Sequence, residues 1–300
     1  MNGPQDSVPV LEIGGTHVSA AWVDPDGWRV VESNRFGLRA DAGRDELLAG
    51  LAAAAAGLAA GAGASWGVAL PGPFDYQAGV AHYAGVAKFE GLAGVDLRSA
   101  LYELLPQRPG SIRFVNDASA FLIGEWLIGT AKGATRCAAI TLGTGIGSAF
   151  LDRGDVVDSG GSVPPQAELH LLQHAGLPLE DWVSRRALRR AYAKATGAAD
   201  DGVEDGVDVK ELANRARAGD LAALASFAAA FIVLGEVLGP WLERFGTDQL
   251  VVGGAISNAW DLIEGPLRIG LSRYSDCRYA IGVAAEPARS PLVGAAYGAG

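Results

Sequence analysis

The chain has 300 residues, of which 49% are apolar, so it can bury one large core or two moderate ones. Its formal net charge is −10. This argues against a nucleic-acid partner, because binding phosphates requires clustered Lys and Arg. The two cysteines, Cys137 and Cys277, are too few and too far apart for a disulfide framework or a cysteine-rich zinc site. We therefore expect a reduced, cytoplasmic protein.

Two apolar stretches are long enough to cross a membrane, at residues 47–66 and 221–245. The first is mostly Ala and Gly, and alanine favours helices while being only weakly hydrophobic. The second contains Glu236 and Pro240. The first residues of the chain lack the positive region of a signal peptide. Both stretches therefore predict packed core helices, and we expect no membrane span.

Strands and helices alternate along the chain, which predicts an α/β fold. A hairpin is expected at 8–23, further strands at 28–33, 66–70 and 111–115, a second hairpin at 138–151, and a strand running into a glycine turn at 249–257. Helices are expected at 45–60, 95–105, 118–128, 179–192, 220–245, 258–272 and 291–300.

The second hairpin turns at Leu142-Gly143-Thr144-Gly145, between two apolar runs. Glycines allow close backbone approach, and successive N–H groups in such a turn can bind an anion. The pattern predicts a phosphate loop. A dinucleotide fingerprint is disfavoured, because a helix should follow its glycines and a short apolar run follows here. A plain hairpin without a ligand is the other interpretation.

An internal echo supports the phosphate interpretation. Residues 13–22 contain Gly14-Gly15-Thr16 and lie 129 residues before the similar stretch at 142–151. Both predict a strand, a Gly/Thr turn and a second strand. Two related half-domains could each offer a phosphate hairpin to a nucleotide held between them.

Two strand ends carry further polar or turn residues. Pro71-Gly72-Pro73 closes the strand at 66–70, and Asn116-Asp117 follows the strand at 111–115. Ligands of open α/β sheets gather at strand ends. Asp117 has two interpretations, the N-cap of the next helix or a general base in a cleft.

Taken together, these motifs resemble the ROK family of sugar kinases, in the actin/hexokinase superfamily. The resemblance covers nearly the whole chain and rests on the segments at 12–16, 70–73, 115–118, 142–147 and 251–254. It implies an α/β, two-lobed, actin/hexokinase-like (ribonuclease H-like) fold with nucleotide and substrate in the cleft. The expected lobes are 1–117 with a C-terminal helix at about 290–300, and 118–289. A homodimer is also implied.

The resemblance implies a role for each matching residue. Asp117 would be the general base and would bind the sugar, together with Gly72, Asn116, Glu168, His170 and Glu180. ATP would be held by Gly14, Gly15, Thr16, Gly143, Thr144, Gly145, Gly253 and Gly254. Glu12 would act on Mg²⁺, through water. Polyphosphate is an alternative phosphoryl donor in this family.

Four departures from the family pattern bear on these roles. Glu12 stands where Asp is usual, and residues 173–180 lack the family's zinc cysteines, so no zinc site is expected. Ala167-Glu168-Leu169-His170 replaces the usual Gly-Glu-x-Gly-His, which leaves His170 or His174 as the sugar contact. Residues 85–90 lack the Asn of sugar-binding relatives. The acceptor is therefore a hexose or a sugar-like polyol, with a C7-cyclitol (carbasugar) as the alternative.

Competing functions follow from the same features. The repressors of this family carry an N-terminal DNA-binding segment, whereas here the phosphate motif begins at Glu12. A non-catalytic sugar sensor is the alternative class, because of Glu12 and the altered His segment. An ATP- and Mg²⁺-dependent carbohydrate kinase is the prediction.

Overall fold

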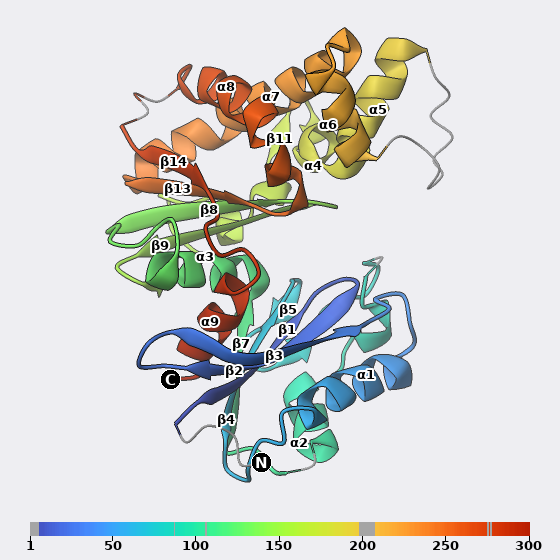
Figure 1. The fold of residues 1–300 in the computed structure, drawn as a ribbon, viewed down its shortest axis with the longest axis vertical. Helices are drawn as coiled ribbons and strands as arrows, with labels where there is room; N and C mark the ends of the chain where they lie inside the picture. The colour runs from blue at the N-terminus through green and yellow to red at the C-terminus, as the bar shows by residue number, and fades with distance from the viewer. Residues whose placement is uncertain (1–5, 87, 106, 198–207, 275, 277) are drawn as a thin grey trace. The chain divides into compact units, whose positions relative to one another are not determined.

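A computed structural model describes residues 6–86, 88–105, 107–197, 208–274, 276 and 278–300. Cys277 and most of the acidic segment before Asp208 lie outside the described residues. The chain forms two compact units (Figure 1): unit 1 is Met1–Gly129 with Glu286–Gly300, and unit 2 is Thr130–Ala285.

The unit boundaries differ from those expected at 117–118 and 289–290. Helix α3 (Asp117–Ile128) belongs to unit 1, where it packs against the C-terminal helix α9 (Ser290–Tyr297). The close packing depends on glycine, since a Cβ on Gly294 would collide with the backbone of Ala120. The helix that follows Asp117 therefore stays with the sheet from which it emerges.

Unit 1 is built on a five-stranded sheet of order β3-β2-β1-β4-β7. Its strands are β1 (Val8–Ile13), β2 (His17–Asp24), β3 (Arg29–Gly37), β4 (Ser65–Leu70) and β7 (Ser111–Asn116). Successive residues of β1 face opposite sides of the sheet. Leu11 packs in the core that holds α1 (Arg44–Ala56) and α2 (Leu97–Leu104), and Val10 packs with α9. The short strands β5 (Phe74–Asp75) and β6 (Val80–Ala81) and the 3₁₀ helix η1 (Glu90–Leu92) complete the unit.

Unit 2 has a second five-stranded sheet, of order β10-β9-β8-β13-β14. Its strands are β8 (Arg136–Leu142), β9 (Ile146–Asp152), β10 (Asp155–Val156), β13 (Gln249–Gly253) and β14 (Ala280–Val283). Its helices are η2 (Pro165–Ala167), η3 (Leu169–Leu171), α4 (Glu180–Val183), α5 (Arg185–Thr196), α6 (Val209–Arg217), α7 (Leu221–Phe245), η4 (Ala255–Ala259) and α8 (Trp260–Leu271), with a ribbon of β11 (Gln173–His174) and β12 (Leu177–Pro178).

The two sheets repeat one topology, in agreement with the internal echo of the sequence. In unit 1, β1 is antiparallel to β2 and parallel to β4, which is parallel to β7. In unit 2, β8 is antiparallel to β9 and parallel to β13, which is parallel to β14. The two Gly/Thr turns therefore join equivalent strands of equivalent sheets.

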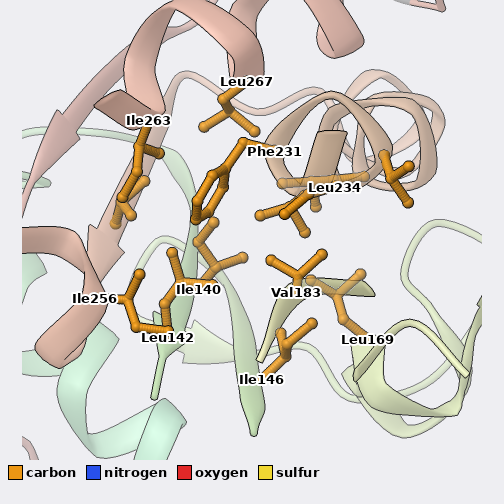
Figure 2. Close-up of a cluster of buried hydrophobic side chains, with 14 of the residues drawn as sticks. Ile140, Leu142, Ile146, Leu169, Val183, Phe231, Leu234, Ile256, Ile263 and Leu267 are labelled. Carbon is orange, nitrogen blue, oxygen red and sulfur yellow. The ribbon is translucent and has the colours of Figure 1, made fainter. Parts of the chain in front are cut away.

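The core of unit 2 anchors the loops that carry its polar residues (Figure 2). Leu142 and Ile146 flank the glycine turn, Leu169 follows Glu168, and Val183 ends the helix of Glu180. All four side chains lie in one buried cluster with residues of α7 and α8 such as Phe231 and Ile263. Because both residues flanking the turn are buried, the turn between them is held in place.

Several elements differ from prediction, among them three in unit 2. The helix expected at 179–192 is broken at Ser184, whose hydroxyl accepts a hydrogen bond from the N–H of Ala187 at 3.2 Å and caps α5. Helix α6 and strand β14 were not predicted. Strand β14 has four residues, and its extended form depends on pairing with β13.

Helix α7 is the one described helix long and apolar enough to cross a membrane. Half of its most apolar window is buried inside the protein. Phe231 and Leu234 are fully buried in the core of unit 2. These contacts are those of a core helix.

Candidate active site

The first glycine turn joins β1 to β2 in unit 1. The N–H of Gly14 donates to the carbonyl oxygen of His17 at 2.8 Å, which closes the hairpin. Thr16 at its tip is exposed to solvent. Neither Gly14 nor Gly15 has a positive φ, so the small size of these residues, and not an unusual backbone angle, distinguishes this turn. The turn is compact and accessible, as a phosphate-binding hairpin requires.

Glu12 lies at the end of β1, beside this turn, and is held by two neighbours. Its Oε2 accepts a hydrogen bond from Ser19 Oγ at 3.0 Å and lies 3.3 Å from His17 Nε2. Arg35 contacts His17 Nδ1 at 3.0 Å, and a guanidinium can only donate. Nδ1 is therefore the acceptor, and His17 donates from Nε2 to Glu12. This arrangement leaves Oε1 of Glu12, on the side of Gly14, for another ligand.

Asn116 and Asp117 lie where β7 runs into α3. The N-cap is Asn116, not Asp117: Asn116 Oδ1 accepts from the N–H groups of Ala118 and Ser119 at 2.9 and 3.2 Å. Asp117 is the first helical residue, and its Oδ1 accepts from Ala118 N–H at 2.8 Å. The capping interpretation of Asp117 is therefore wrong, and its second oxygen is left for other chemistry.

The environment of Asp117 shifts its acidity. Burial, assisted by the nearby Glu12 carboxylate, raises the pKa of Asp117 to about 6, although the hydrogen bond from Ala118 and the charge of Lys88 act to lower it. Burial disfavours the charged form of a carboxyl group, whereas donors and cations favour it. A carboxyl group with a pKa close to neutral pH is suited to accept a proton.

Two tyrosines line the end of β4 next to Asn116. Asn116 Nδ2 donates to Tyr76 Oη at 2.9 Å, and Tyr76 donates to the carbonyl of Leu70 at 3.3 Å. Tyr83 is buried and donates to the carbonyl of Pro71 at 2.5 Å, next to Gly72. These bonds fix the turn that holds Gly72. Sequence reasoning missed both tyrosines, since nothing local distinguishes them from core residues.

Lys88 is a further residue near this group. A Cβ on Gly15 would lie 3.4 Å from Lys88 Nζ, so the ammonium packs over the first glycine turn. Its charge also lowers the pKa of Asp117. The sequence signal for Lys88 is its place in the segment at residues 85–90, which lacks the Asn of sugar-binding relatives.

The second glycine turn, in unit 2, is occupied by a carboxylate. Glu180 Oε1 accepts from the N–H of Ile146 at 2.9 Å, and a Cβ on Gly145 would collide with that oxygen. The carbonyl of Gly143 accepts from Arg185 N–H at 3.0 Å. Thr144 is exposed, and the space beside Gly143 is open. The structure thus brings Glu180 to the turn, where the first backbone N–H after the glycines binds a carboxylate oxygen.

Glu168 and His170 lie together in the same unit. His170 Nε2 is 3.4 Å from Glu168 Oε2, and burial raises the pKa of Glu168 while His170 lowers it. Ser148 holds the loop: its hydroxyl donates to the carbonyl of Ala167 at 2.6 Å and accepts from Leu169 N–H at 2.9 Å. His170 therefore lies beside Glu168, although it stands one residue earlier in the chain than the His of the family pattern.

His174 has a different neighbour. Its ring lies 5.1 Å from that of Trp182 at an interplanar angle of 86°, and its carbonyl accepts from Trp182 Nε1 at 3.1 Å. This is a packing contact between β11 and α4.

The backbone just before Glu168 is strained. Gln166 and Ala167 both have φ of +57°, in the left-handed region that favours glycine. Ala167 stands where the sequence pattern of the resembled family has Gly. Strain of this kind is tolerated where a loop positions functional side chains.

We expect Ala167→Gly to raise the free energy of unfolding by about 1 kcal/mol, because glycine adopts the left-handed conformation without a Cβ penalty. Urea denaturation of both proteins measures the difference. Ala213→Gly, in the helical conformation of α6, is the control and should lose about 1 kcal/mol. A loss of stability in Ala167→Gly would contradict the strain.

Gly253 ends β13, and Gly254 follows it. Gly254 has φ of +84°, and a Cβ there would collide with the backbone of Leu142 at the start of the glycine turn. Glycine is therefore required for β13 to pack against that turn. This packing is a structural reason for Gly254, beside the nucleotide contact that the sequence predicts.

Among the described residues, no group of three or more His, Cys, Asp or Glu side chains is arranged to hold a metal ion. Mg²⁺ needs fewer protein ligands, because it keeps several waters and binds through one or two carboxylates and substrate phosphates. Glu12 fits such an ion through its remaining oxygen, Oε1. Asp117 offers a second carboxyl group nearby, since it lies close enough for the charge of Glu12 to raise its pKa.

Comparison with known proteins connects this arrangement to a family. The family model described as the ROK family matches residues 9–165, more than half of the chain. The chain belongs to the ROK family. The match spans both glycine turns, Asp117 and the segment before Glu168.

Individual relatives match along most of their length. The glucokinase of Thermotoga maritima is 28% identical over 277 residues, covering 86% of this chain and 84% of its own. The ROK hexokinase of Thermus thermophilus is 25% identical with a TM-score of 0.75, covering 97% of this chain and 96% of that one. A Streptomyces griseus ROK glucokinase, solved with glucose and AMPPNP, is 22% identical with a TM-score of 0.76, covering 97% and 98%. The fold is thus the two-lobed actin/hexokinase-like α/β fold of ROK proteins.

Proposed function

We propose that this carbohydrate kinase transfers a phosphoryl group from ATP to a hydroxyl of a hexose or sugar-like polyol, with Asp117 as the general base. One observation carries the proposal: Asp117 has a raised pKa of about 6 and lies near Glu12, beside a glycine turn suited to phosphate. Phosphoryl transfer needs positioning, charge neutralisation and a group that accepts the hydroxyl proton.

Asp117 supports the base role through its two oxygens. Oδ1 accepts the N–H of Ala118, which orients the carboxylate, and the other oxygen can accept the proton of an attacking hydroxyl. Asn116 is held by α3 and Tyr76 and offers its amide to the same substrate.

The two glycine turns are proposed to bind the phosphates, through Gly14, Gly15 and Thr16 in unit 1 and Gly143, Thr144 and Gly145 in unit 2. The hydrogen bond that the Glu180 carboxylate accepts from the N–H of Ile146 supports anion binding by the second turn. Gly253 and Gly254 are proposed to lie near the adenosine. Glu12 would hold Mg²⁺ through water, and the ion would neutralise phosphate charge when bound.

The acceptor is proposed to be a neutral polyol. Glu168 and His170 form an adjacent carboxylate and imidazole that suit vicinal hydroxyls, and Glu180 and Gly72 are further candidate contacts. Relatives named glucokinase favour a hexose. The altered segment at Ala167–His170 keeps a C7-cyclitol as the alternative. A homodimer and a cytoplasmic location are further proposals from the family.

ADP release with Mg-ATP, across hexoses, N-acetylated amino sugars and cyclitols, tests the proposal. Acceptor-dependent turnover is expected, together with its loss in Asp117→Asn. ATP binding without turnover on any acceptor would favour the sensor. Polyphosphate in place of ATP, in the same assay, tests the donor.

Replacing Glu12 with Asp is expected to raise the Mg²⁺ concentration that gives half-maximal activity. The shorter side chain draws the carboxylate back from the Oε1 position, although the charge is kept. The increase in ATP affinity that Mg²⁺ causes, measured by calorimetry, gives a second readout. Glu32→Asp, on the exposed edge strand β3, is the control. Unchanged metal dependence in both assays would remove Glu12 from the metal site.

A further inference from the structure

Lys88 is an exposed residue directly before one that is anchored in the core of unit 1. The next residue, Phe89, is buried, and its N–H donates to the carbonyl of Ala40 at 2.7 Å. The Phe89 ring lies 5.5 Å from that of Tyr83, whose hydroxyl is bonded to Pro71. Phe89 also has φ of +59°, which the surrounding contacts maintain. The core of unit 1 therefore holds the chain directly after Lys88.

The side chain of Lys88 extends over the first glycine turn. Three of its atoms, Nζ, Cδ and Cε, lie 3.4–3.5 Å from the point a Gly15 Cβ would occupy. Among the described residues, no carboxylate forms an ion pair with Lys88 within 4.0 Å. A cation near a phosphate turn, without an ion pair among the described residues, is placed to bind an anion.

The charge of Lys88 also reaches the proposed general base. It acts on Asp117, whose pKa it lowers, while Glu12 raises that pKa. Lys88 therefore lies in the electrostatic field shared by the phosphate turn and the base. All three belong to unit 1.

We propose that Lys88 is a catalytic residue that binds the transferred phosphoryl group, an inference that rests on the proposed kinase function. The acceptor oxygen forms a bond to the phosphorus, the bond to the bridging oxygen of ADP breaks, and ADP leaves with that electron pair. The hydroxyl proton goes to Asp117. Lys88 forms no covalent bond and neutralises charge on the phosphoryl oxygens.

This role accounts for the positive charge in a segment where the sequence lacks an expected Asn. A sugar-binding Asn recognises hydroxyls through both donor and acceptor groups, whereas an ammonium only donates. Lys88 lies against Gly15 of the phosphate turn, which favours the phosphoryl group over the neutral acceptor as its ligand.

The test compares Lys88→Met, Lys88→Arg and the control Lys210→Met, a lysine on an exposed face of α6. We expect Lys88→Met to lower kcat about 10²–10³-fold, as removal of one preorganised donor does, with acceptor KM changed less than about threefold. Lys88→Arg should have a kcat at least tenfold higher than that of Lys88→Met. Lys210→Met should match the wild type.

A second measurement separates this inference from the kinase proposal. Mg-ADP with aluminium fluoride mimics the transferring phosphoryl group and needs no turnover. We expect the fluoride to tighten ADP binding in the wild type and Lys88→Arg, but not in Lys88→Met.

The outcomes are distinct. Absence of acceptor turnover in the wild type would overturn the kinase proposal, while the fluoride titration would still decide the role of Lys88. Equal tightening in Lys88→Met would overturn that role. A raised acceptor KM with unchanged kcat would instead assign Lys88 to an anionic acceptor and would also overturn it.

Discussion

Asp117→Asn is expected to lower kcat about 10²–10⁴-fold while leaving ATP binding and the fold intact. The amide keeps the size of the side chain and can still accept from Ala118 N–H, but it cannot take up the hydroxyl proton. Acceptor-dependent ADP release measures the loss. Asp75→Asn, in the exposed β5 turn, is the matched control and should keep wild-type activity. Wild-type turnover in Asp117→Asn would exclude the base role.

The pH dependence of the wild type follows from the same group. Burial raises the pKa of Asp117 from 3.8 to about 6, and only the deprotonated form accepts a proton. The value of kcat/KM is therefore expected to fall about tenfold per unit below pH 6. Lys88→Met should move this acid limb to higher pH, because removing the cation raises the pKa of Asp117.

Asp117→Asn should also stabilise the fold at neutral pH. Between about pH 4 and 6 the folded state keeps the Asp117 proton while the unfolded state releases it, so stability falls as pH rises through this window. Above pH 6 the full loss in the free energy of unfolding is at most about 3 kcal/mol. Solvent screening reduces this figure, because the side chain is partly exposed. Asn removes that loss. The gain measured by urea at pH 7.5 should vanish at pH 4.

Glu125→Ala is expected to lower the free energy of unfolding of unit 1 by about 2–4 kcal/mol. Glu125 is fully buried in α3, and its Oε1 accepts from Glu286 N–H at 3.1 Å and from Ser290 Oγ at 2.7 Å. Truncation leaves the buried Ser290 hydroxyl and the half-buried Glu286 N–H without this acceptor and opens a cavity. These bonds hold the segment where the chain returns to unit 1.

Urea denaturation followed by circular dichroism measures this loss. Glu103→Ala, at an exposed position of α2, is the control and should stay within about 0.5 kcal/mol of the wild type. Glu125→Gln keeps an acceptor oxygen and should lose less than Glu125→Ala. Equal stability of Glu125→Ala and Glu103→Ala would show that the buried carboxylate does not anchor α9.

Much of the fold could be predicted from the sequence, because the main signals are local. The two Gly/Thr hairpins, the strand before Asn116 and the long helix at 221–245 follow from apolar periodicity and turn residues. The elements that were missed or misjudged depend on partners: β14 needs β13, and the break at Ser184 needs the capping hydroxyl.

Candidate site residues divide in the same way. Motif residues such as Asp117, Gly143 and Glu168 could be selected from the sequence, since their types and spacing carry the chemistry. The neighbours that tune them could not. Tyr76, Tyr83 and Lys88 come from segments distant in sequence from Asp117 and reach its surroundings only in the folded unit.

By itself, the sequence of this protein determined the α/β class, the repeated phosphate hairpin and the family resemblance, since each depends on residue type and short-range order. Only the tertiary structure decided that Asn116 caps α3, that burial raises the pKa of Asp117, and that Lys88 lies over Gly15. The physical reason is that burial, charge proximity and close packing are properties of residues brought together by folding, and no local pattern encodes them.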